Sequence, residues 1–292
     1  MSTIDICICT YRRTSLEDTL RSIARQSGMQ ADLRVIIADN DGSPSARSLV
    51  EQIAIGFPFH ITYCHAPSKN ISIARNACLS ASTARFIVFI DDDLIAAPTW
   101  ISSLEKARSQ TGADAIFGPV QAIYPESAPH WLQQTKPHSI KPSFNNGVLK
   151  TGYSCNVMIK GGLAREHAFD QRFGVSGGED TDYFYRIWKK GAHYAFAQDA
   201  TVIERIAPTR LTIKWLFKRS FRSGQTYARL VKDQHSFSYA LISAMIKAVY
   251  CFGTAVLMSP WPSKSRLSTI RGALHLGVML SLIGVRDLKI YK

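Results

Sequence analysis

Short apolar segments alternate with amphipathic segments over the first 120 residues. The apolar segments are rich in Ile, Val and Phe, which is typical of strands buried on both faces. Between them, Leu and Ile recur at helical spacing. The pattern predicts strands at 4–10, 33–39, 59–64, 85–90 and 113–120 and helices at 15–26, 44–55, 71–82 and 98–109. For the helix at 44–55, Ser43 is the expected N-cap and Pro44 the first helical residue. This order predicts an α/β fold with a mostly parallel sheet and helices on both faces.

The pattern changes after residue 122. Four prolines between 123 and 150 predict a long loop, followed by a strand at 151–159 and a helix at 179–190. From Arg210 onward the chain is expected to be helical and basic. Residues 239–258 are long and apolar enough to span a bilayer, although Lys247 lies near their middle, whereas the apolar stretch 272–285 is short for a span. We expect two helices that lie in the membrane interface or form a shallow hairpin, with a soluble helical pair as the alternative.

The net charge of +13 is confined to the C-terminal part. Residues 1–204 hold 20 Lys and Arg and 20 Asp and Glu, whereas residues 205–292 hold 15 Lys and Arg and two Asp. A neutral front part with a basic tail predicts a catalytic or binding domain joined to a module for an anionic surface. The N-terminus lacks the pattern of a secretory signal, and the six scattered cysteines form no C-x-x-C pair, which favours buried thiols in a reducing compartment.

Acidic residues follow one of the predicted strands directly. Asp91, Asp92 and Asp93 come straight after the strand at 85–90, at the sheet edge where such folds bind ligands. Three adjacent carboxylates repel one another unless a cation neutralises them, and Mg²⁺ or Mn²⁺ takes oxygen ligands while leaving positions for substrate phosphates. A solvated acidic turn is the alternative interpretation.

Other polar groups accompany this triplet. Glu179 and Asp180 begin a predicted helix after two glycines, and a carboxylate among other carboxylates can serve as a general base. Stabilisation of the helix dipole by these acids is the alternative. Arg75 suits a phosphate or a base edge, or is a surface arginine, and Asp39 begins an Asp-Asn-Asp-Gly run that is compatible with a plain turn.

The ordered set of motifs resembles the inverting family-two glycosyltransferases with a GT-A fold. The motifs are Ile8–Arg13 (ICTYRR), Ala38–Asn40, Ala74–Asn76, Asp91–Asp93 and Gly178–Asp180. The segments SKNISIARN (68–76), SGGEDTD (176–182) and FRSGQT (221–226) are similar to the glucosyltransferases of succinoglycan-type exopolysaccharide synthesis. The resemblance implies a GT-A catalytic domain at 1–209, with a nucleotide-sugar half at about 1–122 and an acceptor half at about 123–209. Residues 210–292 would then form a basic helical region for membrane and acceptor association.

The resemblance also implies roles for single residues. Thr10 and Tyr11 would line the uridine pocket, Asp39 would accept a hydrogen bond from uracil, and Asp180, with Glu179 beside it, would be the catalytic base. Asp93, with Asp91, would hold the Mg²⁺ or Mn²⁺ that bridges two phosphates. The expected donor-binding residues are Thr10, Tyr11, Arg12, Asp39, Arg75, Asp91 and Asp92. Related enzymes often carry a metal-binding His where this chain has Ile203, so either the metal has one protein ligand fewer or Glu204 substitutes.

The run Arg219–Arg222 (RSFR) is similar to the Arg/Gln-x-x-Arg motif of processive synthases. Those enzymes have Trp at the next position, where this chain has Ser223, and this difference disfavours processive polymerisation. Arg219, Arg222 and Gln225 are expected to contact an acceptor pyrophosphate, and a solvated basic helix face is the alternative. The implied partners are a UDP-sugar, most simply UDP-glucose, a polyprenyl-pyrophosphate-linked oligosaccharide and an anionic membrane surface.

The resemblance places the protein at the cytoplasmic face of the inner membrane as a peripheral or monotopic protein. Nucleic acid is not an expected partner, because the basic residues are interleaved with long aliphatic runs. The alternatives are a nucleotidyltransferase, which the lack of glycine in 10–14 disfavours, and a scaffold that binds nucleotide sugars without transfer.

Overall fold

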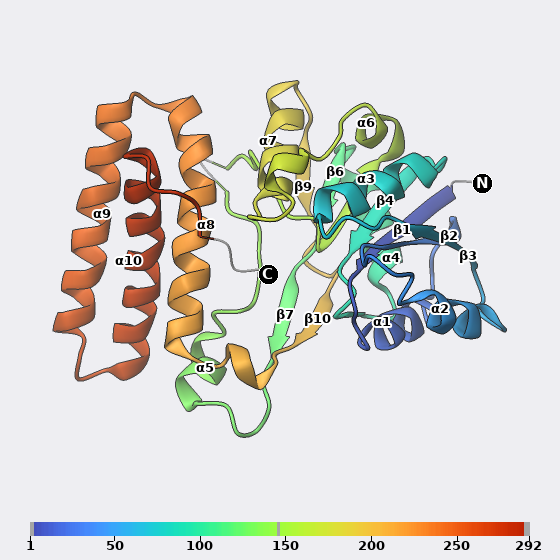
Figure 1. Cartoon of the computed structure of the whole chain (residues 1–292), viewed down its shortest axis with the longest axis horizontal. Coiled ribbons are helices and arrows are strands. Elements are labelled where there is room, and N and C mark those ends of the chain that lie inside the picture. The colour runs from blue at the N-terminus through green and yellow to red at the C-terminus, as the bar shows by residue number, and fades with distance from the viewer. Residues whose placement is uncertain (1–2, 145–146, 289–292) are drawn as a thin grey trace. The chain divides into compact units, whose positions relative to one another are not determined.

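A mixed sheet forms the centre of the first part of the chain in the computed structural model, which describes residues 3–144 and 147–288. Its strand order is β3-β2-β1-β4-β8-β6-β9 (Figure 1). The strands are β1 (Thr3–Thr10), β2 (Asp32–Asp39), β3 (His60–His65), β4 (Phe86–Ile90), β6 (Ala115–Phe117), β8 (Asn156–Lys160) and β9 (Tyr194–Phe196). The first four in the order are parallel, and β8 runs antiparallel to β4 and β6. The mostly parallel sheet is therefore confirmed.

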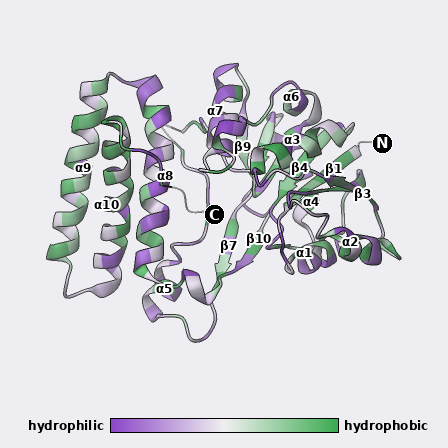
Figure 2. Cartoon of the chain, in the orientation of Figure 1, coloured by the Kyte–Doolittle hydropathy of each residue, from purple (hydrophilic) through white to green (hydrophobic). Residues whose placement is uncertain are grey.

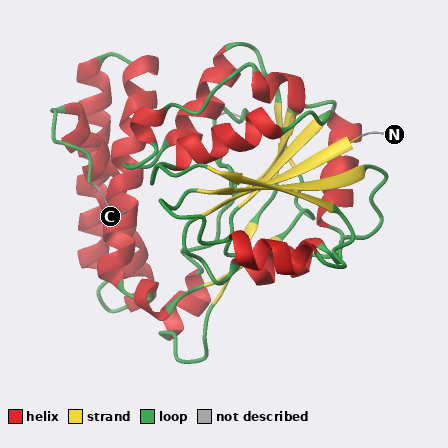
Figure 3. Cartoon of the chain, turned by 45° about the vertical axis from the view of Figure 1, so that its right-hand side comes forward, coloured by secondary structure: helices red, strands yellow, loops and turns green. Residues whose placement is uncertain are grey.

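Helices cover both faces of this sheet (Figure 3). One face packs on α1 (Leu16–Ile23), α2 (Arg47–Ala54) and α4 (Trp100–Thr111) in one apolar cluster. The other face packs on α3 (Ile71–Ala81), α6 (Gly161–Arg165) and α7 (Glu179–Lys189) in a second cluster. Both faces are buried, which explains the near-continuous apolar runs of β1, β2 and β4. All six cysteines are free; Cys7, Cys78 and Cys155 are buried and the others are half-buried.

Two elements expected in the first 120 residues differ from the structure. Helix α2 begins at Arg47 with Ala46 as N-cap and no side-chain cap, so the prediction of Ser43 as the cap was wrong. The Ser43 hydroxyl instead donates to Asp41 (3.3 Å), which keeps this segment in a turn. The strand expected at 113–120 divides into β6 and β7 (Val120–Ile123). The break falls at Gly118, where an added Cβ would lie 2.2 Å from the Ala200 carbonyl oxygen.

The region after β7 is more ordered than expected. The loop predicted at 123–150 contains α5 (His130–Thr135), and residues 145–146 of that prediction lie outside the described residues. The strand predicted at 151–159 begins only at Asn156. A second sheet has the order β5-β10-β7, with β5 (Leu94–Ala96) antiparallel to β10 (Val202–Arg205).

The chain forms two compact units. The first comprises Met1–Gln121, Ile140–Val175 and Glu179–Glu204, and the second Ala122–Ser139, Ser176–Gly178 and Arg205–Lys292. The expected boundary at 209/210 is close to the last of these divisions, but two earlier segments also belong to the second unit. The helices of the second unit are α5, α8 (Ile213–Gln234), α9 (Phe237–Leu257) and α10 (Pro262–Leu282), with a short 3-10 turn at Pro208–Arg210. Another 3-10 turn, at Gln171–Phe173, lies in the first unit.

Helices α8, α9 and α10 pack closely because small residues line their contacts. A Cβ on Gly277 would lie 2.0 Å from the Phe221 carbonyl oxygen, and one on Gly224 would lie 1.9 Å from that of Leu274. On α9 the buried positions are Ala240, Ala244, Ala248 and Ala255. Helix α9 is mostly apolar in Figure 2, and only 22% of its most apolar 18-residue window is buried. By length and composition, it is the one helix among the described residues that could cross a membrane.

Candidate active site

The polar residues singled out in the sequence lie at one edge of the main sheet. Strand β1 ends at Thr10, β2 ends at Asp39, and β4 ends immediately before Asp91. These strands are parallel neighbours, so their carboxyl ends share an edge. The sheet therefore brings together three segments that are separated by long stretches of sequence.

Arg75 lies at the centre of this edge. Its guanidinium forms an ion pair with Glu179 and is 3.8 Å from the Asp91 carboxylate, and only 8% of its side chain is exposed. The ring of Phe169 lies 5.5 Å from the Arg75 guanidinium carbon. Arg75 therefore joins the acidic triplet after β4 to the acidic start of α7.

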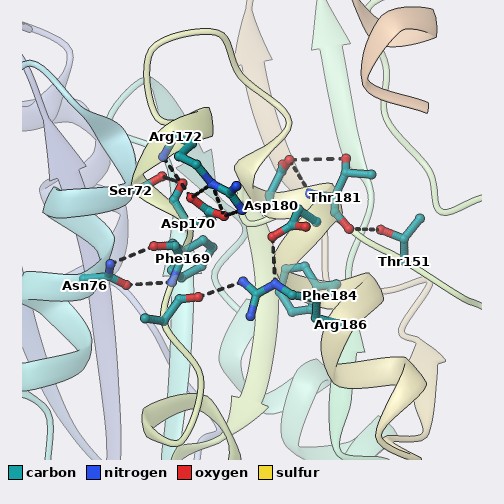
Figure 4. A network of polar contacts seen from close by, with 12 residues as sticks. Ser72, Asn76, Thr151, Phe169, Asp170, Arg172, Asp180, Thr181, Phe184 and Arg186 are labelled. Atoms are coloured by element: carbon teal, nitrogen blue, oxygen red, sulfur yellow. Dashed lines mark hydrogen bonds and ion pairs between the residues drawn. The ribbon is translucent and has the colours of Figure 1, made fainter. Parts of the chain in front are cut away.

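The position of Arg75 follows from how α3 is anchored. Asn70 caps the helix by accepting from the backbone N–H groups of Ser72 (3.1 Å) and Ile73 (3.4 Å). The Asn76 amide donates to the Phe169 carbonyl (2.9 Å) and accepts from the Phe169 N–H (2.8 Å), as Figure 4 shows. These contacts fix α3 at both sides of Arg75.

The carboxylates of the triplet differ in their surroundings. Burial raises the pKa of Asp91 to about 7, the neighbouring carboxylates add to this, and Arg75 opposes it. The Asp91 side chain is nevertheless 46% exposed, so water weakens the effect of burial and leaves more of the shift to the neighbouring charges. Burial also raises the pKa of Asp92 to about 6, while Asp93 lies 3.5 Å from Arg13. The site thus holds more negative charge than its own cations neutralise.

This donor set suits a hard divalent cation. No group of three or more His, Cys, Asp or Glu among the described residues has the arrangement of an all-protein metal site. Two carboxylates completed by substrate phosphates are, however, a usual way of binding Mg²⁺. Asp91 and Asp93 offer such a pair. Ile203 is half-buried on β10. Glu204 is buried and lies opposite Leu94 in the β10–β5 strand register, and Leu94 is the residue that follows Asp93.

Asp180 lies in the first turn of α7 and is half-buried. Its carboxylate accepts from the Thr181 N–H (2.7 Å), and the Thr181 carbonyl accepts from the Thr151 hydroxyl (2.8 Å), as Figure 4 shows. Burial, and then the charge of Glu179, raises the pKa of Asp180 to about 6, against the opposing charge of Arg75. A carboxylate with this pKa can accept a proton near neutral pH.

Tyr11 is flanked by two cations. The Arg12 guanidinium and the Lys69 ammonium lie 5.5 Å and 5.6 Å from its ring centroid. Both residues have a left-handed backbone, with φ of 52° and 47°. Arg12 also donates to Asp41 (2.8 Å). The backbone thus turns two basic side chains toward one aromatic ring at the end of β1.

Asp39 is fully buried and already engaged. Its carboxylate accepts from the N–H groups of Asp41 (3.0 Å) and Ala46 (2.8 Å) and from the Tyr63 hydroxyl (2.8 Å). These bonds fold the turn after β2. The contact with uracil expected for Asp39 stays a prediction.

The expected acceptor-binding residues belong to α8. Arg219 lies with its guanidinium 5.4 Å from the Trp215 ring centroid, and Arg222 donates to the Ser176 carbonyl (3.3 Å). Gln225 is buried, and its amide donates to the Arg286 carbonyl (3.0 Å) and accepts from the Leu288 N–H (2.9 Å). The Gln225 amide therefore fastens the segment after α10.

Three supporting residues were not predicted to act at the site. Asn40 is buried, and its amide oxygen accepts from the Asn70 N–H (3.1 Å), which links the turn after β2 to the start of α3. Lys69 and Phe169 contact Tyr11 and Arg75, respectively. Asn40 and Lys69 lay within recognised motifs, but no local pattern indicates the contact of Lys69 with Tyr11 or that of Phe169 with Arg75.

Comparison with known proteins gives consistent matches. The family model of Glycosyl transferase family 2 matches residues 5–172. The chain is 41% identical to the succinoglycan biosynthesis protein ExoM of Rhizobium meliloti (strain 1021), over 99% of this chain and 95% of that protein. It is 23% identical to the glucosyl-dolichyl phosphate glucuronosyltransferase of Haloferax volcanii, over 79% of this chain and 77% of that protein.

A solved structure supports the fold. The mannosyltransferase PcManGT from Pyrobaculum calidifontis, solved in complex with GDP-Man and Mn²⁺, aligns with a TM-score of 0.67. The alignment covers 96% of this chain and 86% of that one at 16% sequence identity. The likeness to a glycosyltransferase structure extends over almost the whole chain.

Proposed function

Because the chain belongs to glycosyl transferase family 2, and is thus a glycosyltransferase of GT-A-like fold, we propose that it transfers a sugar from a UDP-sugar, most simply UDP-glucose, in exopolysaccharide biosynthesis. The acceptor in this proposal is a polyprenyl-pyrophosphate-linked oligosaccharide. The pathway rests on the 41% identity to the succinoglycan biosynthesis protein. One observation carries the proposed chemistry. At one sheet edge, Arg75 lies beside the Asp91 carboxylate and forms an ion pair with Glu179, the residue before Asp180 at the start of α7.

In the proposed donor site, Tyr11 and the cations beside it receive the nucleotide. Thr10, Arg12, Asp39, Arg75 and Asp92 complete this site. Asp91 and Asp93 would hold Mg²⁺ or Mn²⁺, which when bound would neutralise the diphosphate of the donor. The raised pKa of Asp91 supports this, because crowded carboxylates favour a bound cation.

Asp180 is the proposed general base. Its carboxylate would take the proton of the acceptor hydroxyl as the oxygen attacks the anomeric carbon and the bond to UDP breaks. Attack on the face opposite the leaving group inverts the anomeric centre, so an α-linked donor yields a β-linked product. Glu179 is already paired with Arg75, which leaves Asp180 as the acidic side chain suited to proton transfer.

Membrane attachment is the remaining part of the proposal. Helix α9 exposes large apolar side chains along its length, at Phe237, Tyr239, Ile242, Met245, Ile246, Val249, Tyr250, Val256 and Leu257. The surplus of basic residues after residue 204 suits an anionic surface. We place the protein at the cytoplasmic face of the inner membrane as a peripheral or monotopic enzyme, with Arg219 and Arg222 near the acceptor pyrophosphate.

Thermal shift and transfer assays test the proposal together. UDP-glucose with Mn²⁺ is expected to raise the melting temperature, since a ligand at 100 times its Kd stabilises by about 2.7 kcal/mol. Asp180→Asn should keep this shift and lose transfer of labelled glucose. Transfer by Asp180→Asn at the wild-type rate would refute the assignment of the base. A shift with another UDP-sugar would replace glucose, and binding without transfer to any lipid-linked acceptor would favour a scaffold.

A further inference from the structure

Apart from the candidate active site, a group of aromatic and basic side chains lies in the second of the two units, which we call the helical unit. Trp131 and Leu132 of α5 and Leu216 of α8 are buried in one apolar cluster, and Trp215 packs against it. The guanidinium groups of three arginines lie over the two indoles. We call Trp131, Trp215, Arg210, Arg219 and Arg266 the tryptophan–arginine cluster.

The cluster is built around a buried histidine. His138 is fully buried, and burial lowers its pKa to about 4, so the ring is neutral. Its Nε2 lies 3.2 Å from the Arg210 carbonyl oxygen and its Nδ1 lies 2.9 Å from the Tyr124 hydroxyl. A carbonyl only accepts, so Nε2–H donates to it and the Tyr124 hydroxyl donates to Nδ1. The ring also stacks on Trp215 with centroids 5.3 Å apart, which fixes that indole.

Each indole has at least one guanidinium group over its ring. Arg210 and Arg219 lie 5.5 Å and 5.4 Å from the Trp215 ring, and Arg266 lies 5.4 Å from the Trp131 ring. Within residues 3–144 and 147–288, neither Arg219 nor Arg266 forms an ion pair. Stacking preorganises a guanidinium while its N–H groups stay available for phosphate oxygens. The cluster is therefore suited to bind phosphate.

The surroundings favour phosphate on a lipid. Trp261, at the start of α10, is 55% exposed, and the adjoining residues include the exposed Lys264. The Ser263 hydroxyl donates to Gln134 of α5 (3.0 Å), which places this exposed tryptophan at the same end of the unit as Trp131. Tryptophan and basic residues together are enriched where proteins meet lipid headgroups.

We propose that the tryptophan–arginine cluster binds the phosphate groups of phospholipid headgroups at a membrane surface. The inference rests on the membrane attachment proposed above and names the contact that would carry it. A lipid-linked pyrophosphate lies at the same depth as the headgroups, so this assignment agrees with an acceptor role for Arg219.

A matched pair of double variants tests the inference in the full chain. Arg219→Gln with Arg266→Gln removes one stacked cation from α8 and one from α10. Lys218→Gln with Lys264→Gln removes the same charge from exposed positions on the same two helices. Binding is measured by sedimentation with vesicles of phosphatidylcholine, with and without phosphatidylglycerol.

We expect the arginine variant to lose at least tenfold more affinity for the phosphatidylglycerol vesicles than the lysine variant. An equal loss would mean general electrostatic attraction and would overturn the proposal. If both variants bind vesicles equally but inorganic pyrophosphate stabilises only the wild type and the lysine variant, the site takes a soluble diphosphate, and the headgroup assignment fails.

Arg219→Lys with Arg266→Lys provides a second test that keeps the charge. Lysine lacks the planar group that stacks on indole, so we expect this variant to lose affinity as well, with an unchanged circular dichroism spectrum. Wild-type affinity in this variant would contradict the role of stacking. The outcome is separable from the proposed function, because the absence of a UDP-sugar shift in the wild type would leave the vesicle comparison valid.

Discussion

Arg75 and Glu179 form an ion pair between α3 and the first residue of α7 in which each side chain is only 8% exposed. The two residues are 104 positions apart in the chain. The pair holds the start of α7 beside the acidic triplet, so it positions the neighbouring Asp180.

Breaking this pair should destabilise the protein strongly. Arg75→Leu leaves the buried Glu179 carboxylate without its cation, and we expect a loss of about 3–5 kcal/mol in the free energy of unfolding. The double variant Arg75→Leu with Glu179→Leu should recover much of that stability but not transfer. Urea unfolding and UDP release measure the two effects. The matched control is Arg172→Leu, which removes an exposed guanidinium from its ion pair with Asp170 and should leave urea unfolding nearly unchanged.

The acidic site should make stability fall as pH rises. The pKa values of Asp91, Asp92 and Asp180 lie at about 7, 6 and 6, above the ordinary value of 3.8. Between pH 3.8 and about 7 the folded state therefore binds more protons than the unfolded state, and this contribution to stability is lost as pH rises. Melting temperatures across this range should show the decline for these groups.

Manganese provides the complementary measurement for the same groups. Mn²⁺ should raise the melting temperature more at pH 8 than at pH 5, because protonated carboxylates bind metal poorly. Asp91→Asn should weaken both the decline with pH and the response to Mn²⁺. A metal effect that is the same at both pH values would contradict the assignment of Asp91.

Transfer should depend on the protonation of Asp180. With a pKa of about 6, its carboxylate is deprotonated above that value, so kcat should fall as the pH drops below about 6. Measurement of kcat at saturating donor and acceptor isolates this group from effects on binding. A rate that stays constant down to pH 4 would show that another group accepts the proton.

Gly178 should tolerate no side chain. Its φ is +88°, and an added Cβ would lie 2.3 Å from the Thr226 Cγ2 atom of α8. We expect Gly178→Ala to lower stability by about 1–3 kcal/mol, through backbone strain together with the clash. Adding Thr226→Ala removes the clashing methyl and hydroxyl groups but not the backbone strain, so it should restore only part of the loss. Thermal unfolding of the two variants checks this, and complete restoration would show that the strain is negligible.

The sequence predicted the elements of the sheet better than their pairing. The apolar runs located β1, β2 and β4, and the position of Asp91 after β4 followed from them. The insertion of β8, antiparallel, between β4 and β6 has no local signal, because it depends on contacts distant in the chain. The prediction of Ser43 as a cap was wrong for a local reason, because its hydroxyl donates to the Asp41 carboxylate two residues before it.

The site was predictable where one segment carries the chemistry. Asp180 in the first turn of α7 follows from the Gly-Gly-Glu-Asp motif and the helical pattern after it. The partner of Glu179 did not follow, because an ion pair across 104 residues requires the tertiary fold. Lys69 beside Tyr11 depends on a left-handed backbone at a residue that seldom adopts it, so its contact could not be predicted from composition.

The helical unit is assembled from three separate stretches of the chain, and this limits how the protein can be divided. Trp131 and Leu132 of the first stretch are buried together with Leu216 of the third. A chain shortened at residue 204 would keep the first stretch and lose what covers it, leaving an indole and a leucine side chain uncovered. The first unit therefore cannot be separated by a single cut in the chain, and its solubility as an isolated fragment should depend on removing 122–139 as well.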